Sequence, residues 1–339
     1  MSYRIGTWNL ENLFRPGDDG PSSKDEYHAK LTSLAAVIDD LGTDVLCVQE
    51  VGDPDALTDL VKLLDGPWHT ALADPDGRGI RCGIISTRDL TEVDQIAAFP
   101  DTLQPVQVDD DGTTIMAMGR PALKATVTLG GTSLTVISAH LKSKLLSYPG
   151  GRFAPKDEGE RARYGFYALA RRAGEATALR AGADLAVDGS GAKHAVLVAG
   201  DLNDEPKAAT TQILLGPGGS EIGTRGFDKP DKGDATRLWN LAPKIPEAER
   251  YSRVYQGATR SSTTSSSPRL WSRRSPPSPR APRSLAGHHR STTTRRCAGT
   301  SPAPTTDRWS LTSTCEHPTR EHTTISGGRP RYADIDNTP

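Results

Sequence analysis

The chain has 339 residues, 4 cysteines and a formal net charge of −1. This length allows one large domain or two small ones, and four cysteines in so long a chain exclude a disulfide-stapled scaffold. No run of about 18 apolar residues exists, which excludes a membrane-spanning helix. With no secretory signal at the start, we expect a cytoplasmic, monomeric, globular protein for which no protein partner is implied.

Charge and composition divide the chain near residue 256. Residues 1–256 hold 28 Lys and Arg against 37 Asp and Glu, whereas residues 257–339 hold 13 Arg against 5 Asp and Glu. The second segment also has 29 Ser and Thr and 10 Pro, and it contains no Lys, Val or Phe. Such a composition cannot bury enough apolar surface to offset its chain entropy. We therefore predict a folded domain over 1–256 and a low-complexity, disordered segment over 257–339.

Strands and helices are predicted throughout the first segment. Residues 3–10 form a strand, and the helical spacing of apolar residues over 31–41 predicts a helix that ends at Gly42. The remaining strands are predicted at 44–49, 82–86, 114–118, 122–129, 134–139 and 195–199, and the remaining helices at 54–64, 161–187 and 207–215. Several strands follow each other directly, so we expect mixed sheets covered by helices.

Polar residues interrupt four of these apolar strands at their ends. The first strand ends in Asn9 and Glu11, and the second in Glu50. Two later strands end in His140 and in the pair Asp201 and Asn203. Each piece alone is typical of a solvated strand end, an Asx turn or a structural histidine. Their joint occurrence in one order favours an acidic pocket with one histidine at its rim.

Such a pocket suits phosphate chemistry. Carboxylate and amide oxygens are the ligands that Mg²⁺ prefers, and a bound metal can polarise a phosphoryl oxygen. His140 could then protonate the leaving group or donate to a phosphate oxygen, and Asp201 could orient the attacking water. Asn9 and Asn203 can hold ligands or phosphate without adding charge.

The ordered strings TWNLEN, VQEV, SAHLKSK and AGDLNDEP resemble the endonuclease/exonuclease/phosphatase superfamily, which includes pancreatic deoxyribonuclease and abasic-site endonucleases. The resemblance covers the chain from about residue 3 to residue 206. It implies an α/β fold, a four-layer α/β sandwich with two central mixed sheets and the site at their shared end. It also implies cleavage of a phosphodiester or phosphomonoester with Mg²⁺ or Mn²⁺.

By position, the resemblance makes Glu50 the principal metal ligand and Asn9 its amide companion, with Glu11 as a second polar group at the metal. His140 takes the place of the phosphate-contacting or leaving-group histidine, and Asp201 that of the water-orienting carboxylate.

Further residues are assigned to the substrate. The resemblance makes Asn203 a phosphate contact, and Lys142 and Lys144 would touch substrate phosphates. The loop at 74–81 would approach the mouth of the site, and the long loop at 145–164 lies where specificity could be set.

The superfamily also requires a late Asp-His pair, which is absent after Asn203. The late histidines, at 288, 289, 317 and 322, lie in the Arg/Ser/Pro-rich segment. If codons are read one nucleotide earlier, residues 260–267 can become Glu-Ile-Ile-Asp-His-Ile-Leu-Val, and residues 303–310 can give Ser-Asp-His-Arg-Pro-Val-Val. Two matches in the same shift and order favour a frameshift from about residue 257 over a genuine Ser/Arg/Pro-rich tail.

Three functions remain open at this point. The first is a metal-dependent phosphoesterase, a nuclease-like phosphodiesterase with nucleic acid as its expected substrate, inactive as encoded if the missing Asp-His pair is essential. The second is a non-catalytic nucleic-acid-binding protein that uses the basic tail. The third is an inactive remnant. The sequence does not choose among DNA, RNA, lipid and inositol phosphate substrates.

Overall fold

The computed structural model describes residues 2–17, 19–191, 193–216 and 235–241, together with the backbone of four short strands further along the chain. These strands are β12 (Arg253–Tyr255), β13 (Ala258–Arg260), β14 (Ser266–Pro268) and β15 (Arg331–Asp336). All described residues belong to one compact unit, formed by Met1–Ser272 and Ser326–Pro339.

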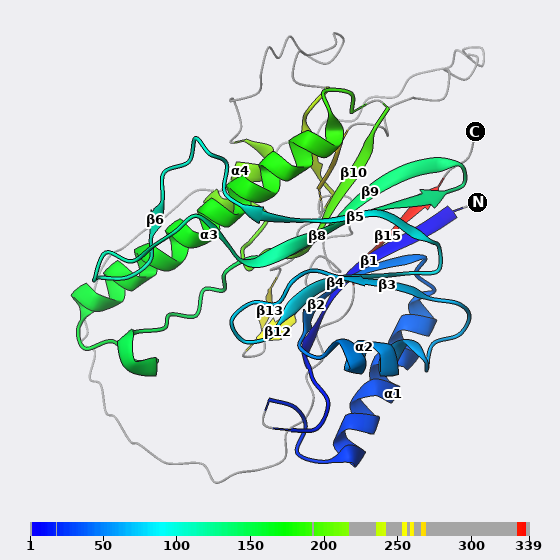
Figure 1. Ribbon diagram of the computed structural model, residues 1–339, viewed down its shortest axis with the longest axis horizontal. Helices are drawn as coiled ribbons and strands as arrows, with labels where there is room; N and C mark the ends of the chain where they lie inside the picture. Colours follow the sequence, from blue (N-terminus) through cyan, green and yellow to red (C-terminus); the bar gives the residue numbers. More distant parts are fainter. Residues whose placement is uncertain are drawn as a thin grey trace, which may run out of the picture. The chain divides into compact units, whose positions relative to one another are not determined.

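The first sheet has five strands in the order β15-β1-β2-β4-β3 (Figure 1). Besides β15 these are β1 (Ser2–Leu13), β2 (Val45–Val51), β3 (His69–Leu72) and β4 (Arg81–Ser86). β1 and β2 run parallel, whereas β4 pairs antiparallel with β2. One face of this sheet is covered by helices α1 (Lys24–Leu41) and α2 (Pro54–Val61), which share a hydrophobic cluster with it.

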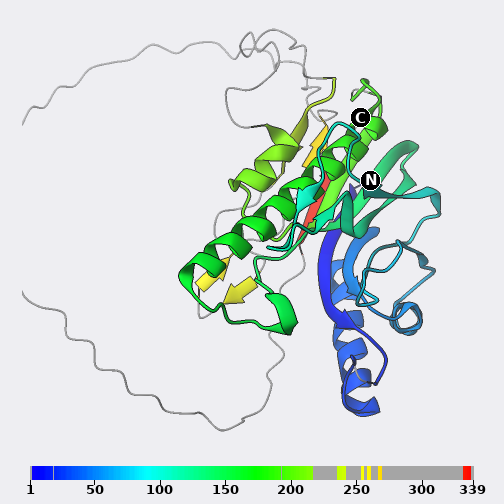
Figure 2. The same cartoon turned by 60° about the vertical axis from the view of Figure 1, so that its left-hand side comes forward.

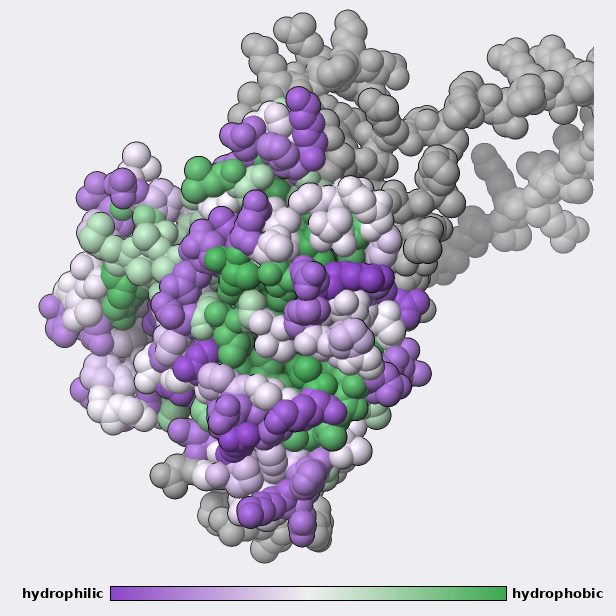
Figure 3. All heavy atoms as spheres, turned by 45° about the vertical axis from the view of Figure 1, so that its right-hand side comes forward, coloured by the Kyte–Doolittle hydropathy of each residue, from purple (hydrophilic) through white to green (hydrophobic). Residues whose placement is uncertain are grey.

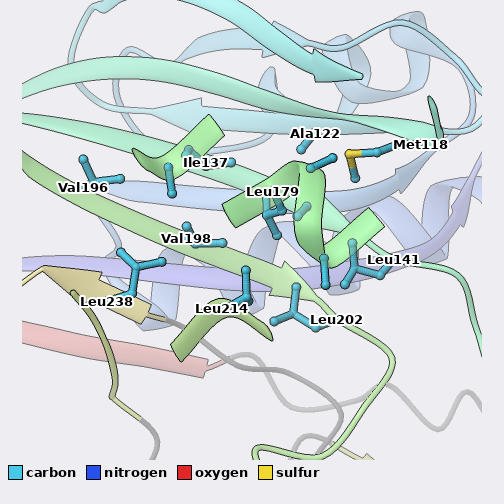
Figure 4. Packing of buried hydrophobic residues seen from close by; sticks show 14 of the residues in the cluster. Met118, Ala122, Ile137, Leu141, Leu179, Val196, Val198, Leu202, Leu214 and Leu238 are labelled. Carbon is cyan, nitrogen blue, oxygen red and sulfur yellow. The ribbon is translucent and has the colours of Figure 1, made fainter. Parts of the chain in front are cut away.

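The second sheet has six strands in the order β11-β14-β10-β9-β8-β5. Besides β14 these are β5 (Leu90–Ala98), β8 (Ala117–Leu129), β9 (Thr132–His140), β10 (Ala195–Asp201) and β11 (Leu238–Asn240). β8 and β9 are antiparallel, and β9 and β10 are parallel. Helices α3 (Glu158–Val187) and α4 (Ala209–Leu215) cover this sheet, and Figure 2 shows α3 lying along it. In Figure 4, Leu179 of α3 and Leu214 of α4 lie in one cluster with Val198 of β10.

The two sheets pack face to face through a third hydrophobic cluster. Ile5, Val45 and Ile84 come from the first sheet, and Leu123 and Val136 come from the second. With α1 and α2 on one outer side and α3 and α4 on the other, this packing makes four layers. The predicted four-layer α/β sandwich with two mixed sheets is confirmed.

Local sequence signals explain where the long helices begin and end. Ser23 caps α1 by accepting the N–H of Glu26, and Gly42 follows its last turn at a φ of 55°, a left-handed conformation that glycine adopts without steric cost. Asp157 caps α3 in the same way by accepting the N–H of Glu160. The helix stop predicted at Gly42 is therefore confirmed.

Some strands differ from the sequence prediction. β3 and β5 were not predicted, because none of their residues is buried and they show no alternation of apolar and polar residues. The strand predicted at 114–118 is divided into the short β7 (Thr114–Ile115), which pairs with β6 (Val106–Gln107), and the start of β8. Pro121 therefore lies inside β8, near a register irregularity opposite β5, where a missing N–H is tolerated.

Part of the segment 257–339 forms strands. β13 pairs with β12, β14 lies between β10 and β11, and β15 pairs with β1. The composition of this segment did not predict these strands. The other residues of 257–339, and with them the late histidines and most of both proposed frameshift strings, lie outside the described residues.

The surface mixes polar and apolar residues. On the face shown in Figure 3, hydrophilic side chains lie around smaller hydrophobic areas. None of the helices that the structure describes is long and apolar enough to cross a membrane.

Candidate active site

The polar strand ends meet because each sheet contributes one parallel pair of strands. In the first sheet Asn9 of β1 lies opposite Gln49 of β2, and Gln49 directly precedes Glu50. In the second sheet Asp201 of β10 lies opposite His140 of β9. Parallel strands end at the same edge of a sheet, so Glu50, His140 and Asp201 come to one place. Asn9 joins them from inside β1, which continues to Leu13 beyond the predicted strand and has a register irregularity after Asn9.

The side chain of Asn9 joins carboxylates from both sheets. Its Nδ2 atom donates to Glu50 Oε1 at 2.8 Å and to Asp201 Oδ2 at 3.3 Å. Glu50 accepts a second hydrogen bond at its other oxygen, Oε2, from the N–H of Asn12 at 3.0 Å. Two carboxylates that would otherwise repel each other are held by one neutral donor between them.

The backbone is strained at these motifs. Six described residues other than glycine have a positive φ, and four of them are Glu11 (53°), Asn12 (54°), Glu50 (59°) and Asn203 (52°). Such conformations cost on the order of 1–3 kcal/mol each and concentrate at functional sites. The strain therefore supports a functional role for these strand ends.

Glu11 lies at the rim of the acidic cluster. Its N–H donates to Asn9 Oδ1 at 2.9 Å, and Lys30 of α1 donates to the carbonyl oxygen of Asn12 at 3.2 Å. Burial raises the pKa of Glu11, Lys30 opposes this shift, and the negative charge of Glu50 adds to it. The two carboxyl groups are therefore close enough to affect each other's ionisation.

His140 is buried, and its Nε2 atom lies 3.9 Å from Glu50 Oε1. Its Nδ1 atom contacts the Nη1 atom of Arg120. A guanidinium can only donate, so Nδ1 is the acceptor and the ring hydrogen belongs on Nε2, the side of Glu50. Burial and the positive charge of Arg120 hold the pKa of His140 well below its usual value. The imidazole is therefore neutral at neutral pH, and its Nε2–H faces the acidic cluster.

Sequence reasoning missed Arg120 and assigned the loop at 74–81 only a general position. Arg120 Nε pairs with Asp76 Oδ2 at 3.0 Å, and both side chains are largely buried. The loop thus reaches the site through Asp76, as expected. A signal for Arg120 was present, because a charged residue in Gly-Arg-Pro precedes an apolar strand, but nothing in the sequence indicates its partner.

Asp201 and Asn203 form the last turn of the site. The N–H of Asn203 donates to Asp201 Oδ1 at 3.0 Å, and its side-chain Nδ2 donates to the carbonyl oxygen of Leu141 at 3.0 Å. These bonds fix the turn after β10 against the residue that follows His140.

Lys142 and Lys144 contact acceptors of the chain itself. Lys142 Nζ donates to the carbonyl oxygen of Leu145 at 2.8 Å, and burial, with the nearby Arg171, lowers its pKa to about 8. Lys144 Nζ lies 2.7 Å from Asp204 Oδ1. Their predicted contact with substrate stays a prediction.

Comparisons with known proteins show the family. The sequence pattern of the Endonuclease/Exonuclease/phosphatase family matches residues 6–285. The chain belongs to this family. The matched range runs beyond residue 256 and into the segment proposed to be frameshifted. A comparison with curated proteins finds no match.

Solved structures with a similar fold come from the same family. A humanized D. rerio TDP2 is 16% identical, with a TM-score of 0.46, over 81% of this chain and 86% of that one. The human Nocturnin catalytic domain with bound sulfate is 15% identical, with a TM-score of 0.43, over 78% and 82%. An endonuclease/exonuclease/phosphatase from Bacteroides vulgatus is 12% identical, with a TM-score of 0.46, over 79% and 87%. Likenesses this distant identify no substrate.

Proposed function

We propose that the chain is a metal-dependent phosphoesterase, a nuclease-like phosphodiesterase that uses Mg²⁺ or Mn²⁺. The observation that carries the proposal is the contact of Asn9 with Glu50 and Asp201 beside His140. This contact joins carboxylates of two sheets into one acidic site that also holds a neutral histidine. Membership of the family supports phosphate-ester hydrolysis in general.

The donor set fits a hard divalent cation. The groups at the centre of the site are the carboxylates of Glu50 and Asp201 and the amide of Asn9, with Glu11 at the rim. Among the described residues no group of three or more His, Cys, Asp or Glu side chains could hold a metal. The proposal therefore rests on the two carboxylates of Glu50 and Asp201, since Mg²⁺ can bind through one or two carboxylates and keep several waters. When bound, the metal would polarise a phosphoryl oxygen and stabilise the leaving oxyanion.

The chain's own residues supply the remaining steps. Asp201 receives N–H groups from Asn9 and Asn203, which fix its carboxylate so that it can orient an attacking water. His140 is neutral, so it donates Nε2–H to a phosphate oxygen rather than acting as a charged acid. The guanidinium of Arg120 adds positive charge behind that hydrogen bond.

Nucleic acid is the proposed substrate class. Arg120 contacts His140, and Arg120 and Arg171 both act electrostatically on Lys142. A few cations within an acidic domain favour a short contact with substrate phosphates over a broad nucleic-acid surface. The alternative is binding without catalysis through the Arg-rich residues 257–339, which predicts steep salt dependence and no metal-dependent turnover.

Hydrolysis of bis(p-nitrophenyl) phosphate tests the reaction. We expect turnover that requires Mg²⁺ or Mn²⁺ and is removed by EDTA. Glu50→Gln and Asp201→Asn should each lower it by about 100-fold or more, because each takes away a charge at the reacting centre. Glu92→Gln is the matched control, since Glu92 also has a positive φ, of 49°, and lies in β5. Equal loss in all three variants, or turnover without metal, would refute the proposal.

The frameshift is a separate proposal, and the nucleotide sequence of the gene tests it. The nucleotide sequence across residues 250–315 should encode Ile-Asp-His and Ser-Asp-His in the shifted frame. If it does, the corrected chain should hydrolyse the phosphodiester faster than the chain as written. If the shifted frame encodes neither motif, the Arg/Ser-rich segment is genuine.

A further inference from the structure

Two neighbouring strands separate just before the site. The antiparallel ladder between β8 and β9 ends at the pair Leu123 and Ser138. The same register, continued, would place Gly119 opposite Lys142. Both residues are beyond the ladder, so their N–H groups need another acceptor.

The carboxylate of Glu175, on α3, supplies that acceptor. Its Oε1 atom accepts the N–H of Gly119 at 3.1 Å, and its Oε2 atom accepts the N–H of Lys142 at 2.6 Å. Arg171, one turn earlier in α3, donates to Oε1 at 3.1 Å. Glu175 is 1% exposed, so this charge is held in the interior by three donors. Burying a carboxylate without such partners is strongly unfavourable, so Glu175 depends on these three donors.

The two bridged peptides flank the residues that meet at the site. Gly119 directly precedes Arg120, and Lys142 follows His140 by two residues. Arg120 and His140 contact each other through Nη1 and Nδ1. Glu175 therefore ties together the two backbone segments whose side chains form that contact.

Arg172, which lies three residues before Glu175 in α3, also holds these backbone segments together. Arg172 donates from Nη1 to the carbonyl oxygen of Lys142 at 3.2 Å and from Nε to Asp204 Oδ2 at 3.2 Å. Asp204 follows Asn203, so one turn of α3 holds the segments after β9 and β10 as well as the start of β8.

We propose that Glu175 is a positioning residue that sets Arg120 against His140 and thereby the rate of phosphate-ester cleavage. The proposal rests on the proposed function. Its geometry is specific for a carboxylate, because both oxygens must accept. Glutamine in the same place would offer one oxygen and would turn an NH₂ group toward an N–H donor.

Asp184 offers a matched control in the same helix. It pairs with Arg180, four residues earlier, as Glu175 pairs with Arg171, and Arg180 Nε donates to its Oδ2 atom at 3.2 Å. Arg180 also donates to the carbonyl oxygens of Leu214 and Thr236, which lie outside the site. Asp184→Asn therefore removes an ion pair of the same spacing without reaching the site.

The kinetic test compares Glu175→Gln with Asp184→Asn at a temperature at which both variants are fully folded. With bis(p-nitrophenyl) phosphate and Mg²⁺, Glu175→Gln should lower kcat by about 10- to 100-fold with KM within about twofold, since a small misplacement of reacting groups carries a cost of this size. Asp184→Asn should stay within about threefold of the wild type. Equal kcat values for the two variants would overturn the proposal, as would a loss that lies only in KM.

A second measurement keeps the proposal testable if the wild type shows no turnover. In thermal unfolding, the Tm losses of Glu175→Gln and Arg120→Met should be non-additive by several degrees, because residues that share contacts couple. The Tm losses of Asp184→Asn and Arg120→Met should be additive. Absence of turnover by both the chain as written and its frame-corrected form, together with this coupling, would refute the proposed function but leave the positioning link intact. Additive losses for Glu175→Gln would refute the link itself.

Discussion

Replacing Asn9 by aspartate tests whether the site depends on a donor between two carboxylates. In the wild type, Asn9 Nδ2 lies 2.8 Å from Glu50 Oε1 and 3.3 Å from Asp201 Oδ2, and Asn9 Oδ1 accepts the N–H of Glu11. Asn9→Asp keeps the size and this acceptor but replaces the donor by a third acceptor. Asn9→Ala removes both and serves as the comparison, because it leaves no new charge.

The expected loss follows from electrostatics. Two unit charges 4 Å apart at an effective dielectric constant of 20 repel by about 4 kcal/mol, and the new carboxyl would face two of them. The new carboxyl can escape this repulsion by binding a proton, so the penalty cannot exceed the free energy of protonating it. At pH 7 that free energy is also about 4 kcal/mol for an ordinary aspartate pKa. Because the site is partly open to water, we expect the free energy of unfolding of Asn9→Asp to be about 2 kcal/mol lower than that of Asn9→Ala at pH 7.

The sign of the pH dependence follows from the same argument. Like charges raise the pKa of the new carboxyl above its unfolded value, so its destabilising effect is present at neutral pH and fades as the pH falls. Urea unfolding of both variants at pH 7 and pH 5, without metal, measures this difference. If Asn9→Asp were as stable as Asn9→Ala at pH 7, the carboxylates would not be close enough to repel, and the geometry of the acidic site would be wrong.

Two further predictions concern residues next to the site. Burial and the positive charge of Arg120 lower the pKa of His140 in the folded protein, so the unfolded protein binds more protons at acidic pH. The free energy of unfolding should therefore fall as the pH drops below about 6.5, by up to about 1.4 kcal/mol per pH unit. His140→Gln should remove that part of the pH dependence in urea unfolding; parallel curves would contradict it. At Gly200, which has a φ of 156°, a Cβ would lie 1.9 Å from the carbonyl oxygen of Ala139. In urea unfolding, Gly200→Ala should therefore lower the free energy of unfolding by about 3 kcal/mol. Gly77→Ala, where nothing lies within 4 Å of an added Cβ, should be nearly neutral. Similar losses in both variants would argue against the close approach of β9 and β10.

Local patterns in the sequence were sufficient for much of the fold. The apolar spacing before Gly42, and the apolar runs that became β2, β9 and β10, depend on neighbours within a few residues of each other. Exposed strands such as β3 and β5 lack this signal, since their partners across the sheet, not their own residues, hold them in place. The strands β14 and β15 were missed for the same reason.

The candidate site shows the same division. The sequence by itself determined that Glu50, His140 and Asp201 lie at or next to the ends of buried strands, because an apolar run that stops at a polar residue is a local feature. It also selected Asn9, although β1 continues past this residue to Leu13. The ends of parallel strands also converge by a general rule, so the sequence alone makes these residues candidates for one site.

Only the tertiary structure decided how the site is held together. Asn9 donates to a carboxylate 192 positions away, and Glu175 bridges two peptides that lie 56 and 33 positions before it. Arg120 and Asp76 join the site in the same way, from a strand start and a loop. Such contacts depend on the packing of one layer against another, and a buried charge or a neutral histidine is set by its surroundings in space rather than by its neighbours in the chain.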